Sequence, residues 1–525
     1  MAFMGIKTDK KVRHALFEIL VLVGILVYLS YWSLPGLVGQ YSFWRDEIFT
    51  AAFISGSWIE LFRDWIGPDV HPPLYFITTK AWASTLGNSE LSLRGLSFAF
   101  ALATVALLWE DWRRNKRIQR LIALLFIACN PTFLYYSQEA RSYTLILFLS
   151  SAVLLRVFEH RYAANVDDSQ KSLSPLGTYM LCIALSLTHY FGFIFAFFIL
   201  ALDFWDKSIS KHRLISVVAI GIICVWPAFH IGFLGNLGGV QQEKLANLTT
   251  TFTPVISTIE AYVYSSLYFV NSGIKPLNII MIVICLGAIS WLYFAKRQAS
   301  NVPSRSQMEC NYSILLISSV VGSLAFVEIF WPITTARNFI ILLYPTSIII
   351  GSTFEAGISE ITQRRAILKV AGVISLASLT MILLLSSKIS LNNLNLKVSH
   401  GIDYKSLALY LKANNLCNKG CFTLDYDPQS NNFGGRIDDY YFGELKLFAY
   451  KKKTSTGNND FNSLPIIGSY KTKAEIKEFA QQFPKRRLIT SCSNDIKPYQ
   501  STPFVLIDKD KQTSKDNYPC ITNYK

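Results

Sequence analysis

The sequence predicts a polytopic α-helical membrane protein with about eleven spanning helices and a small C-terminal α+β domain. Hydrophobic residues make up 51% of the 525-residue chain and charged residues only 16%, whereas soluble domains carry about 25% charged residues. Residues 1–388 are long apolar blocks separated by short charged loops, while residues 389–525 have the composition of a soluble domain. We therefore expect a transmembrane domain over 1–388 and a water-exposed domain over 389–525.

The apolar blocks are about as long as membrane helices, which need about 20 apolar residues. The first block is expected to be an uncleaved helix, because no small-residue cleavage site follows it. The blocks 176–190 and 191–205 form either one long helix or a short hairpin that turns near His189 and Tyr190. The eleven blocks centre on 15–34, 91–110, 119–136, 142–158, 176–190, 191–205, 214–232, 276–295, 312–330, 338–354 and 368–388.

Basic residues predict the topology, because Lys and Arg are enriched in cytoplasmic loops. They gather at the N-terminus and near 113–117, 207–213, 296–305 and 364–369. The remaining loops are then outside the cytoplasm, as is the domain 389–525. These outer loops are 35–90, 137–141, 233–275 and 331–337. We expect a multi-pass protein of the cell inner (cytoplasmic) membrane with an extracytoplasmic, periplasmic C-terminal domain.

The net charge of +15 does not indicate a nucleic-acid partner. Much of the positive charge lies in short loops between apolar blocks, where topology explains it. The sequence has no zinc-finger spacing and no RNA-binding signature. The bilayer is therefore the expected partner of the basic loops.

Four of the nine cysteines lie in the C-terminal domain, and an even number there suits an oxidising compartment. Proximity in the sequence favours the disulfides Cys417–Cys421 and Cys492–Cys520. A zinc site formed by all four is the alternative, although Cys492 and Cys520 lack the short spacing of a zinc ligand pair.

The first outer loop contains adjacent carboxylates in the segment Trp44-Arg45-Asp46-Glu47. The same loop continues to His71-Pro72-Pro73-Leu74-Tyr75, with Arg94 beyond it. A helix N-terminus is the alternative explanation for the acids, because negative charge is favourable there. His71 alone is a weak signal, since loop histidines are commonly just polar.

The second outer loop contains Glu139 and Arg141 between two apolar blocks that are only about five residues apart on the spanning-length rule. Charged groups at that depth are costly unless they are paired or functional. Arg337 repeats the pattern at a later outer helix end. The alternatives are a Glu139–Arg141 pair within a tight turn, and an Arg337 side chain that reaches the lipid headgroups.

Together these residues predict sugar transfer from a polyprenyl-phosphate donor. A carboxylate can take the proton from an acceptor hydroxyl, while arginines and a histidine can hold a phosphate and stabilise it as a leaving group. The lipid would enter from the bilayer. The sequence has no Gly-rich phosphate loop for a nucleotide sugar.

The three motifs, Trp44–Glu47, His71–Tyr75 and Tyr136–Tyr143, resemble those of bacterial C-type (GT-C) membrane glycosyltransferases over about residues 15–355. The family is named for protein mannosyltransferases and includes the aminoarabinose transferase of lipid A. The resemblance implies an inverting transfer from a polyprenyl-phosphate sugar. The domain 389–525 resembles no family that we can name.

The resemblance also implies roles for individual residues. Asp46 matches the catalytic base, Glu47 its positioning neighbour, and Glu139 the second acidic motif. Arg337 matches a phosphate contact, and His71 stands where the aminoarabinose branch has a phosphate-binding Lys; Arg141 is a further candidate phosphate contact. No cofactor is required, although some members bind a divalent metal, for which Asp46, His71 and Glu139 are candidate ligands.

Two other functions remain open. A transporter or lipid flippase would need ionisable residues near the bilayer midplane and internal repeats, and the sequence shows neither. A non-catalytic scaffold would act through its C-terminal domain. The acceptor is a glycolipid, a polysaccharide or a protein, and the 20 basic against 13 acidic residues of 389–525 favour a phosphorylated glycolipid.

Overall fold

The structure is a computed structural model of the whole chain. Contacts between Cα atoms divide it into two compact units, which we describe separately. The first comprises Met1–Leu34, Phe62–Thr79 and Arg94–Asn393, and the second comprises Pro35–Leu61, Lys80–Leu93 and Leu394–Lys525. The structure describes residues 10–38, 43, 45–66, 71–115, 117–165, 175–205, 213–234, 253–266, 305–330, 335–364, 404–414, 416, 421–423, 447–449, 466–470, 481, 486–491, 502–508 and 521–524.

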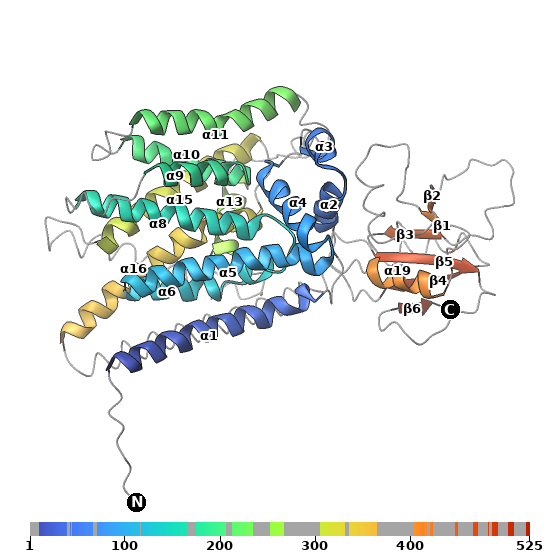
Figure 1. Cartoon of the computed structure of the whole chain (residues 1–525), viewed down its shortest axis with the longest axis horizontal. Coiled ribbons are helices and arrows are strands. Elements are labelled where there is room, and N and C mark those ends of the chain that lie inside the picture. Colours follow the sequence, from blue (N-terminus) through green and yellow to red (C-terminus); the bar gives the residue numbers. More distant parts are fainter. Residues whose placement is uncertain are drawn as a thin grey trace, which may run out of the picture. The chain divides into compact units, whose positions relative to one another are not determined.

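Helices make up nearly all of the described part of the first unit. Figure 1 shows α5, α6, α8, α10 and α11 with their axes close to parallel. The helices that lie wholly or largely in this unit are α1 (Lys10–Leu37), η1 (Leu61–Ile66), α5 (Glu90–Asn115), α6 (Ile118–Ala128), α7 (Pro131–Tyr136), α8 (Tyr143–Asn165), α9 (Pro175–Ser186), α10 (Tyr190–Trp205), α11 (Arg213–Leu234), α13 (Thr253–Ser266), α15 (Arg305–Phe330), η4 (Ala336–Leu342) and α16 (Leu343–Arg364).

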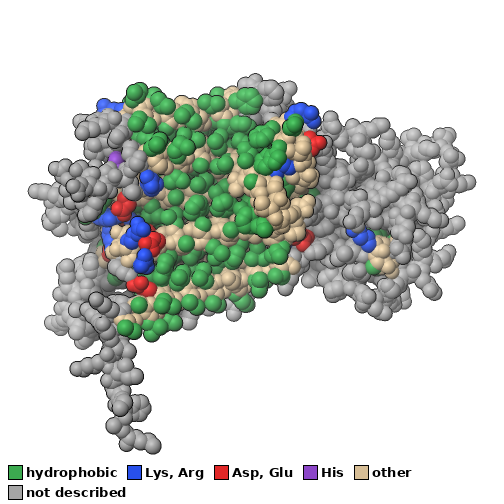
Figure 2. All heavy atoms as spheres, in the orientation of Figure 1, with side chains coloured by type: hydrophobic (Ala, Val, Ile, Leu, Met, Phe, Trp, Pro, Cys, Tyr) green, Lys and Arg blue, Asp and Glu red, His purple; other side chains and the backbone are tan. Residues whose placement is uncertain are grey.

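Five of the described helical segments are long and apolar enough to cross a membrane. They are Ala15–Leu37, Glu90–Asn115, Tyr143–Tyr162, Arg305–Ile329 and Ala336–Ala356. Figure 2 shows hydrophobic side chains along the helices on one face, with charged side chains concentrated toward the helix ends.

Large hydrophobic side chains stay exposed along α1 and α11, as expected where a helix faces lipid. They include Leu16, Phe17, Ile19, Leu20, Val23 and Val27 on α1, and Leu214, Val217, Val218, Ile222, Val225 and Phe229 on α11.

One of the predicted spans differs in detail from the structure. The block 119–136 is not one helix, because α6 ends at Ala128 and α7 begins at Pro131. Asn130 caps α7 by accepting hydrogen bonds from the Thr132 and Phe133 amides, and proline is well tolerated in the first turn that follows such a cap. The apolar blocks 276–295 and 368–388 lie outside the described residues, so the count of about eleven spans stays a prediction.

The predicted loop 35–90 also contains helices. These are α2 (Arg45–Ser55), α3 (Trp58–Glu60) and α4 (Leu74–Leu86), together with η1. The reciprocal hydrogen bonds of a capping box between Ser57 and Glu60 start α3, which is a local signal for a helix N-terminus.

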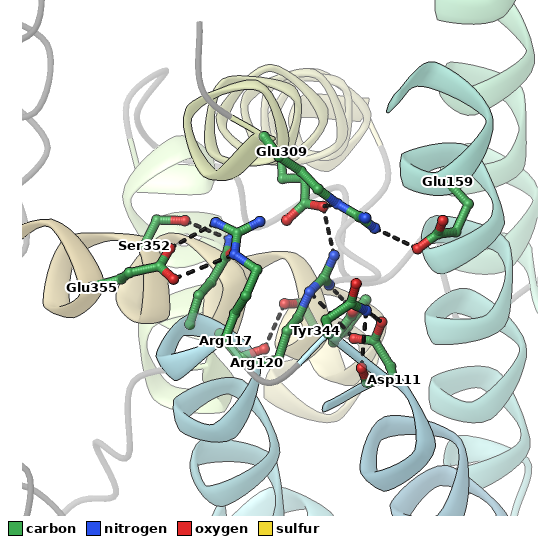
Figure 3. A network of polar contacts seen from close by, with 12 residues as sticks. Asp111, Arg117, Arg120, Glu159, Glu309, Tyr344, Ser352 and Glu355 are labelled. Atoms are coloured by element: carbon green, nitrogen blue, oxygen red, sulfur yellow. Dashed lines mark hydrogen bonds and ion pairs between the residues drawn. The ribbon is translucent and has the colours of Figure 1, made fainter. Parts of the chain in front are cut away.

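A buried ionic network joins five helices in the first unit. The guanidinium of Arg120 lies 2.6 Å from Glu309 of α15 and 3.3 Å from Asp111 of α5. It also donates to the Tyr344 hydroxyl of α16 at 2.6 Å. Arg305 extends the network to Glu159 of α8. Figure 3 shows Asp111, Arg120, Glu159, Glu309 and Tyr344 of this network.

Helices α6 and α16 pack closely beside this network. Arg117 pairs with Glu355 at 2.7 Å, and the Gln119 amide donates to Ser352 at 2.7 Å. A Cβ at Gly351 would lie 2.3 Å from the Gln119 carbonyl oxygen. Only glycine therefore allows this approach of the two backbones.

The C-terminal part of the second unit contains α19 (Tyr404–Ala413) and a mixed six-stranded sheet. The strand order is β2-β1-β3-β5-β4-β6. β1 is parallel to β2 and β3, and the other pairs are antiparallel. The strands are β1 (Cys421–Thr423), β2 (Leu447–Ala449), β3 (Ile466–Tyr470), β4 (Arg486–Ser491), β5 (Thr502–Asp508) and β6 (Ile521–Tyr524). The boundary at residue 388 lies outside the described residues.

Loss of the central cation should destabilise the first unit. We expect Arg120→Ala to lower the free energy of unfolding by about 3–5 kcal/mol, because it leaves buried carboxylates without their cation. Arg113→Ala, which removes an exposed partner of Glu110, should not change the melting temperature measurably. Equal melting temperatures for the two variants in detergent would contradict a stabilising network.

The disulfide Cys417–Cys421 stays a prediction, because Cys417 lies outside the described residues. The disulfide Cys492–Cys520 also stays a prediction, because both of its cysteines lie outside the described residues. Their described neighbours Ser491 and Ile521 are register partners of the antiparallel strands β4 and β6. Mass spectrometry of unreduced peptides should find a Cys492–Cys520 cross-link. Quantitative alkylation of both thiols without reduction would contradict it.

Candidate functional site

The turn between α9 and α10 resolves the ambiguous block 176–205 into two helices. His189 occupies the N-cap position of α10. Its Nδ1 accepts a hydrogen bond from the Phe191 amide at 3.2 Å, and its carbonyl accepts from the Phe193 amide at 3.0 Å. The ring thus takes the place of the Ser, Asn or Asp oxygen that commonly caps a helix.

Gly192 allows α10 to turn back tightly onto α9. A Cβ at this position would lie 2.3 Å from the Leu185 carbonyl oxygen. Any other residue would push the two helices apart at this turn. The sequence His189-Tyr190-Phe191-Gly192 therefore fixes both the cap and the close approach.

The same turn holds the segment that carries His71. The Leu74 amide, at the start of α4, donates to the Leu187 carbonyl at 2.8 Å. Pro72 and Pro73 have no amide hydrogen, so Leu74 provides the first backbone donor after His71. The His71 ring, which is partly exposed, lies with its centre 5.7 Å from that of His189.

Arg337 approaches the same place from the 3-10 helix η4. Its guanidinium carbon lies 5.9 Å from the ring centre of Tyr143, the first residue of α8. The Tyr143 ring in turn lies 6.3 Å from His189 and 4.3 Å from Tyr136. Arg337 is partly exposed, whereas Tyr143 is buried.

Glu139 and Arg141 lie in the short turn between α7 and α8, as the sequence predicts. The Arg141 amide donates to the Glu139 carbonyl at 2.7 Å, and the Ser97 hydroxyl of α5 donates to the Arg141 carbonyl at 3.2 Å. Both residues are buried, with exposed fractions of 3% and 8%.

This turn is anchored to α1. The Gln138 amide donates to the Trp32 carbonyl at 3.0 Å, and the hydroxyls of Ser137 and Ser33 lie 2.5 Å apart. Helix α1 thus fixes the position of a turn that carries two buried ionisable residues.

Three predicted phosphate contacts meet around His189. This histidine lies between the apolar helices Leu176–Ser186 and Tyr190–Phe204. Its pKa lies well below 6.5, first because of burial and then because of the positive charges of His71, Arg141 and Arg337. His71, Arg141 and Arg337 thus each act on His189, and together with His189 we call them the basic cluster.

Asp46 and Glu47 lie in the first turn of α2, which belongs to the second unit. Glu47 is buried, with 2% exposed, and Asp46 is partly exposed. This position agrees with the alternative that both acids stabilise a helix N-terminus. A single site that contains Asp46 with Glu139 and Arg337 stays a prediction.

Lys80 of α4 holds the opposite end of α2. Its ammonium group donates to the carbonyls of Ile54 (2.9 Å) and Gly56, and lies 5.5 Å from the Trp58 ring centre. A cation at a helix C-terminus is favourable, because the carbonyl ends of the helix carry negative partial charge. The helix that presents Asp46 is therefore fixed at its far end.

The described residues contain no group of three or more His, Cys, Asp or Glu side chains that could hold a metal ion. The candidate ligand set Asp46, His71 and Glu139 gains no support from this, and we do not propose a metal.

The sequence did not assign His189 of this cluster, or Tyr143 beside it, to the site. The sequence marked His189 only as the point of a hairpin turn. The only sign of it in the sequence is a histidine between two apolar blocks, each of which is short for a separate span. Tyr143 stood within the second acidic motif without a role.

Two crystal structures of ArnT from Cupriavidus metallidurans are similar to this chain. The apo structure has a TM-score of 0.47 and 10% sequence identity, covering 94% of this chain and 98% of that chain. The structure bound to undecaprenyl phosphate has a TM-score of 0.46 and 12% identity, covering 93% and 97%. No known protein family and no curated protein matches the sequence. Function is therefore inferred from the residues of this chain.

The lowered pKa of His189 predicts a pH dependence of stability. The unfolded histidine binds a proton below about pH 6.5 and the folded one does not, so stability is lost as the pH falls through 6.5. His189→Asn keeps a capping side chain but does not titrate. Between pH 7 and 5.5 we expect wild type to lose about 1 kcal/mol more unfolding free energy than this variant.

Denaturant unfolding in detergent at several pH values measures this difference. Groups whose proton binding is the same in both proteins cancel in the difference. A difference that stays constant with pH would show that His189 binds protons alike in the folded and unfolded states.

Proposed function

We propose that this protein is a membrane glycosyltransferase that moves a sugar from a polyprenyl-phosphate-linked donor to an acceptor at the outer face of the cytoplasmic membrane. The acceptor class is a glycolipid, a polysaccharide or a protein. The basic C-terminal domain favours a phosphorylated glycolipid.

The observation that carries this proposal is the basic cluster at the ends of apolar helices. His71, Arg141 and Arg337 come from three segments far apart in the sequence, and their charges act on one histidine. Two arginines and an imidazole gathered around one histidine provide groups that can bind an anion. At the end of a membrane helix, a phosphate on a lipid is the anion that fits.

The ends of α8 support a placement at the membrane surface. Tyr143 contacts the basic cluster, and Glu159 contacts the Arg120 network. Sixteen residues of α-helix separate them, which corresponds to about 24 Å. That distance approaches the thickness of a bilayer's hydrocarbon core, which is about 30 Å.

The reaction is a single displacement. Asp46 accepts the proton of an acceptor hydroxyl, whose oxygen then attacks the anomeric carbon of the donor sugar. The bond from that carbon to the phosphate oxygen breaks, and its electron pair leaves with the polyprenyl phosphate. Arg337, Arg141 and His71 stabilise the developing negative charge. The anomeric centre is inverted, and Asp46 releases its proton to water.

A transporter or flippase is the runner-up function. It would place ionisable groups near the middle of the spanning helices. Asp111 and Arg120 lie instead close to the helix ends, in the last turns of α5 and the first turn of α6. Glu309 likewise lies near the start of α15. These positions favour a structural role for the network.

Replacement of the base should separate catalysis from folding. We expect Asp46→Asn to reduce transfer from a radiolabelled polyprenyl-phosphate sugar by about a hundredfold to ten-thousandfold, the usual size of general-base catalysis. The melting temperature should stay unchanged, because the amide keeps nearly the same shape. Glu110→Gln, at the exposed end of α5, is the matched control and should transfer normally.

Near wild-type turnover by Asp46→Asn would exclude Asp46 as the base. Glu47 and Glu139 would then be tested in the same way. If neither were required, the enzyme proposal for these loops would fail. Arg337→Ala should instead weaken binding of undecaprenyl phosphate as well as turnover.

A further inference from the structure

We propose that His189 is a further residue of the phosphate site, a neutral imidazole held in one tautomer that presents its Nε2–H to the phosphate bound by the basic cluster. This inference rests on the proposed function and adds a residue to it. It depends on the cap of α10, on the ring contact with His71, and on burial.

The cap fixes which nitrogen carries the proton. Nδ1 of His189 accepts a hydrogen bond from the Phe191 amide at 3.2 Å. A neutral imidazole has one donor and one acceptor nitrogen. With Nδ1 used as the acceptor, the proton lies on Nε2, and the ring can only donate to a second partner.

The surroundings keep His189 in this neutral form. The ring is buried, with 8% exposed, and three cationic or ionisable groups face it: His71 from the segment before α4, Arg141 from the α7–α8 turn, and Arg337 from η4. Burial and like charges both oppose protonation. His189 can therefore contribute a hydrogen-bond donor without adding a positive charge to a cluster that already holds several.

The same turn fixes the position of this donor. The Leu187 carbonyl accepts from Leu74, and the His71 and His189 rings lie 5.7 Å apart. A phosphate held by the partly exposed His71 and Arg337 would therefore lie close to the His189 ring. An immobile donor loses little conformational entropy when it binds.

Two amide substitutions separate donation to phosphate from capping of α10. The Asn carboxamide reaches the position of Nδ1 and is a good cap, but it is too short to replace Nε2–H. The Gln carboxamide reaches the position of Nε2 and offers an N–H, but glutamine is a poorer cap. The stability order and the binding order of these variants should therefore be opposite.

The experiment is titration of undecaprenyl phosphate into the purified full-length protein in detergent, with melting temperatures measured in parallel. We expect His189→Asn to melt like wild type and to bind about tenfold to a hundredfold more weakly, the effect of losing one hydrogen bond to a charged group. His189→Gln should melt at a lower temperature and bind within about threefold of wild type, since its donor remains.

The outcomes distinguish this inference from the proposed function. Normal binding by His189→Asn, or weaker binding that follows the melting temperature across both variants, would make His189 a structural cap only and overturn the inference. Arg337→Ala reports on the proposed function. If Arg337→Ala bound undecaprenyl phosphate normally, the cluster would not be the phosphate site. If it bound weakly while His189→Asn bound normally, only the role of His189 would be lost.

Discussion

The guanidinium of Arg120 sets the arrangement of the helices in the first unit. It contacts Asp111 of α5, Glu309 of α15 and Tyr344 of α16, and its side chain is only 1% exposed. A buried charge is costly unless all of its partners are in place. The helices therefore have one register in which this cation is satisfied. Because helices are stiff, fixing one end of α8 through Glu159 also fixes the turn at its other end.

The turn at this other end of α8 carries Arg141, which belongs to the basic cluster. The Arg120 network matches cations with carboxylates at short distance, and the basic cluster gathers His71, Arg141 and Arg337 around His189. Glu139 lies in the same turn as Arg141, so an acid is close in the chain. An excess of positive charge favours an anionic ligand. The first network thus suits a structural role, and the second carries the charge that the proposed phosphate site needs.

The sequence identified charged residues of the basic cluster but not their arrangement in space. Arg141 and Arg337 were found because a charge at the end of an apolar block is exceptional, and His71 because it follows the acidic motif. The pairing of Arg120 with Glu309 joins residues 189 positions apart, which no local pattern reveals. His189 was missed because its role comes from a turn, and periodicity cannot separate one apolar helix from two short ones. The break at Asn130 was missed for the same reason.

The position of Asp46 separates acceptor activation from donor binding in the proposed reaction, and this separation can be tested. The proposed base, Asp46, lies in the first turn of α2, which Lys80 holds at its far end, and α2 belongs to the second unit. The basic cluster belongs to the first. In the proposed reaction, binding of the lipid phosphate and activation of the acceptor would therefore use residues from separate segments of the chain. It follows that loss of the Asp46 carboxylate should reduce turnover while leaving affinity for undecaprenyl phosphate intact, because no positive charge of the phosphate site is removed.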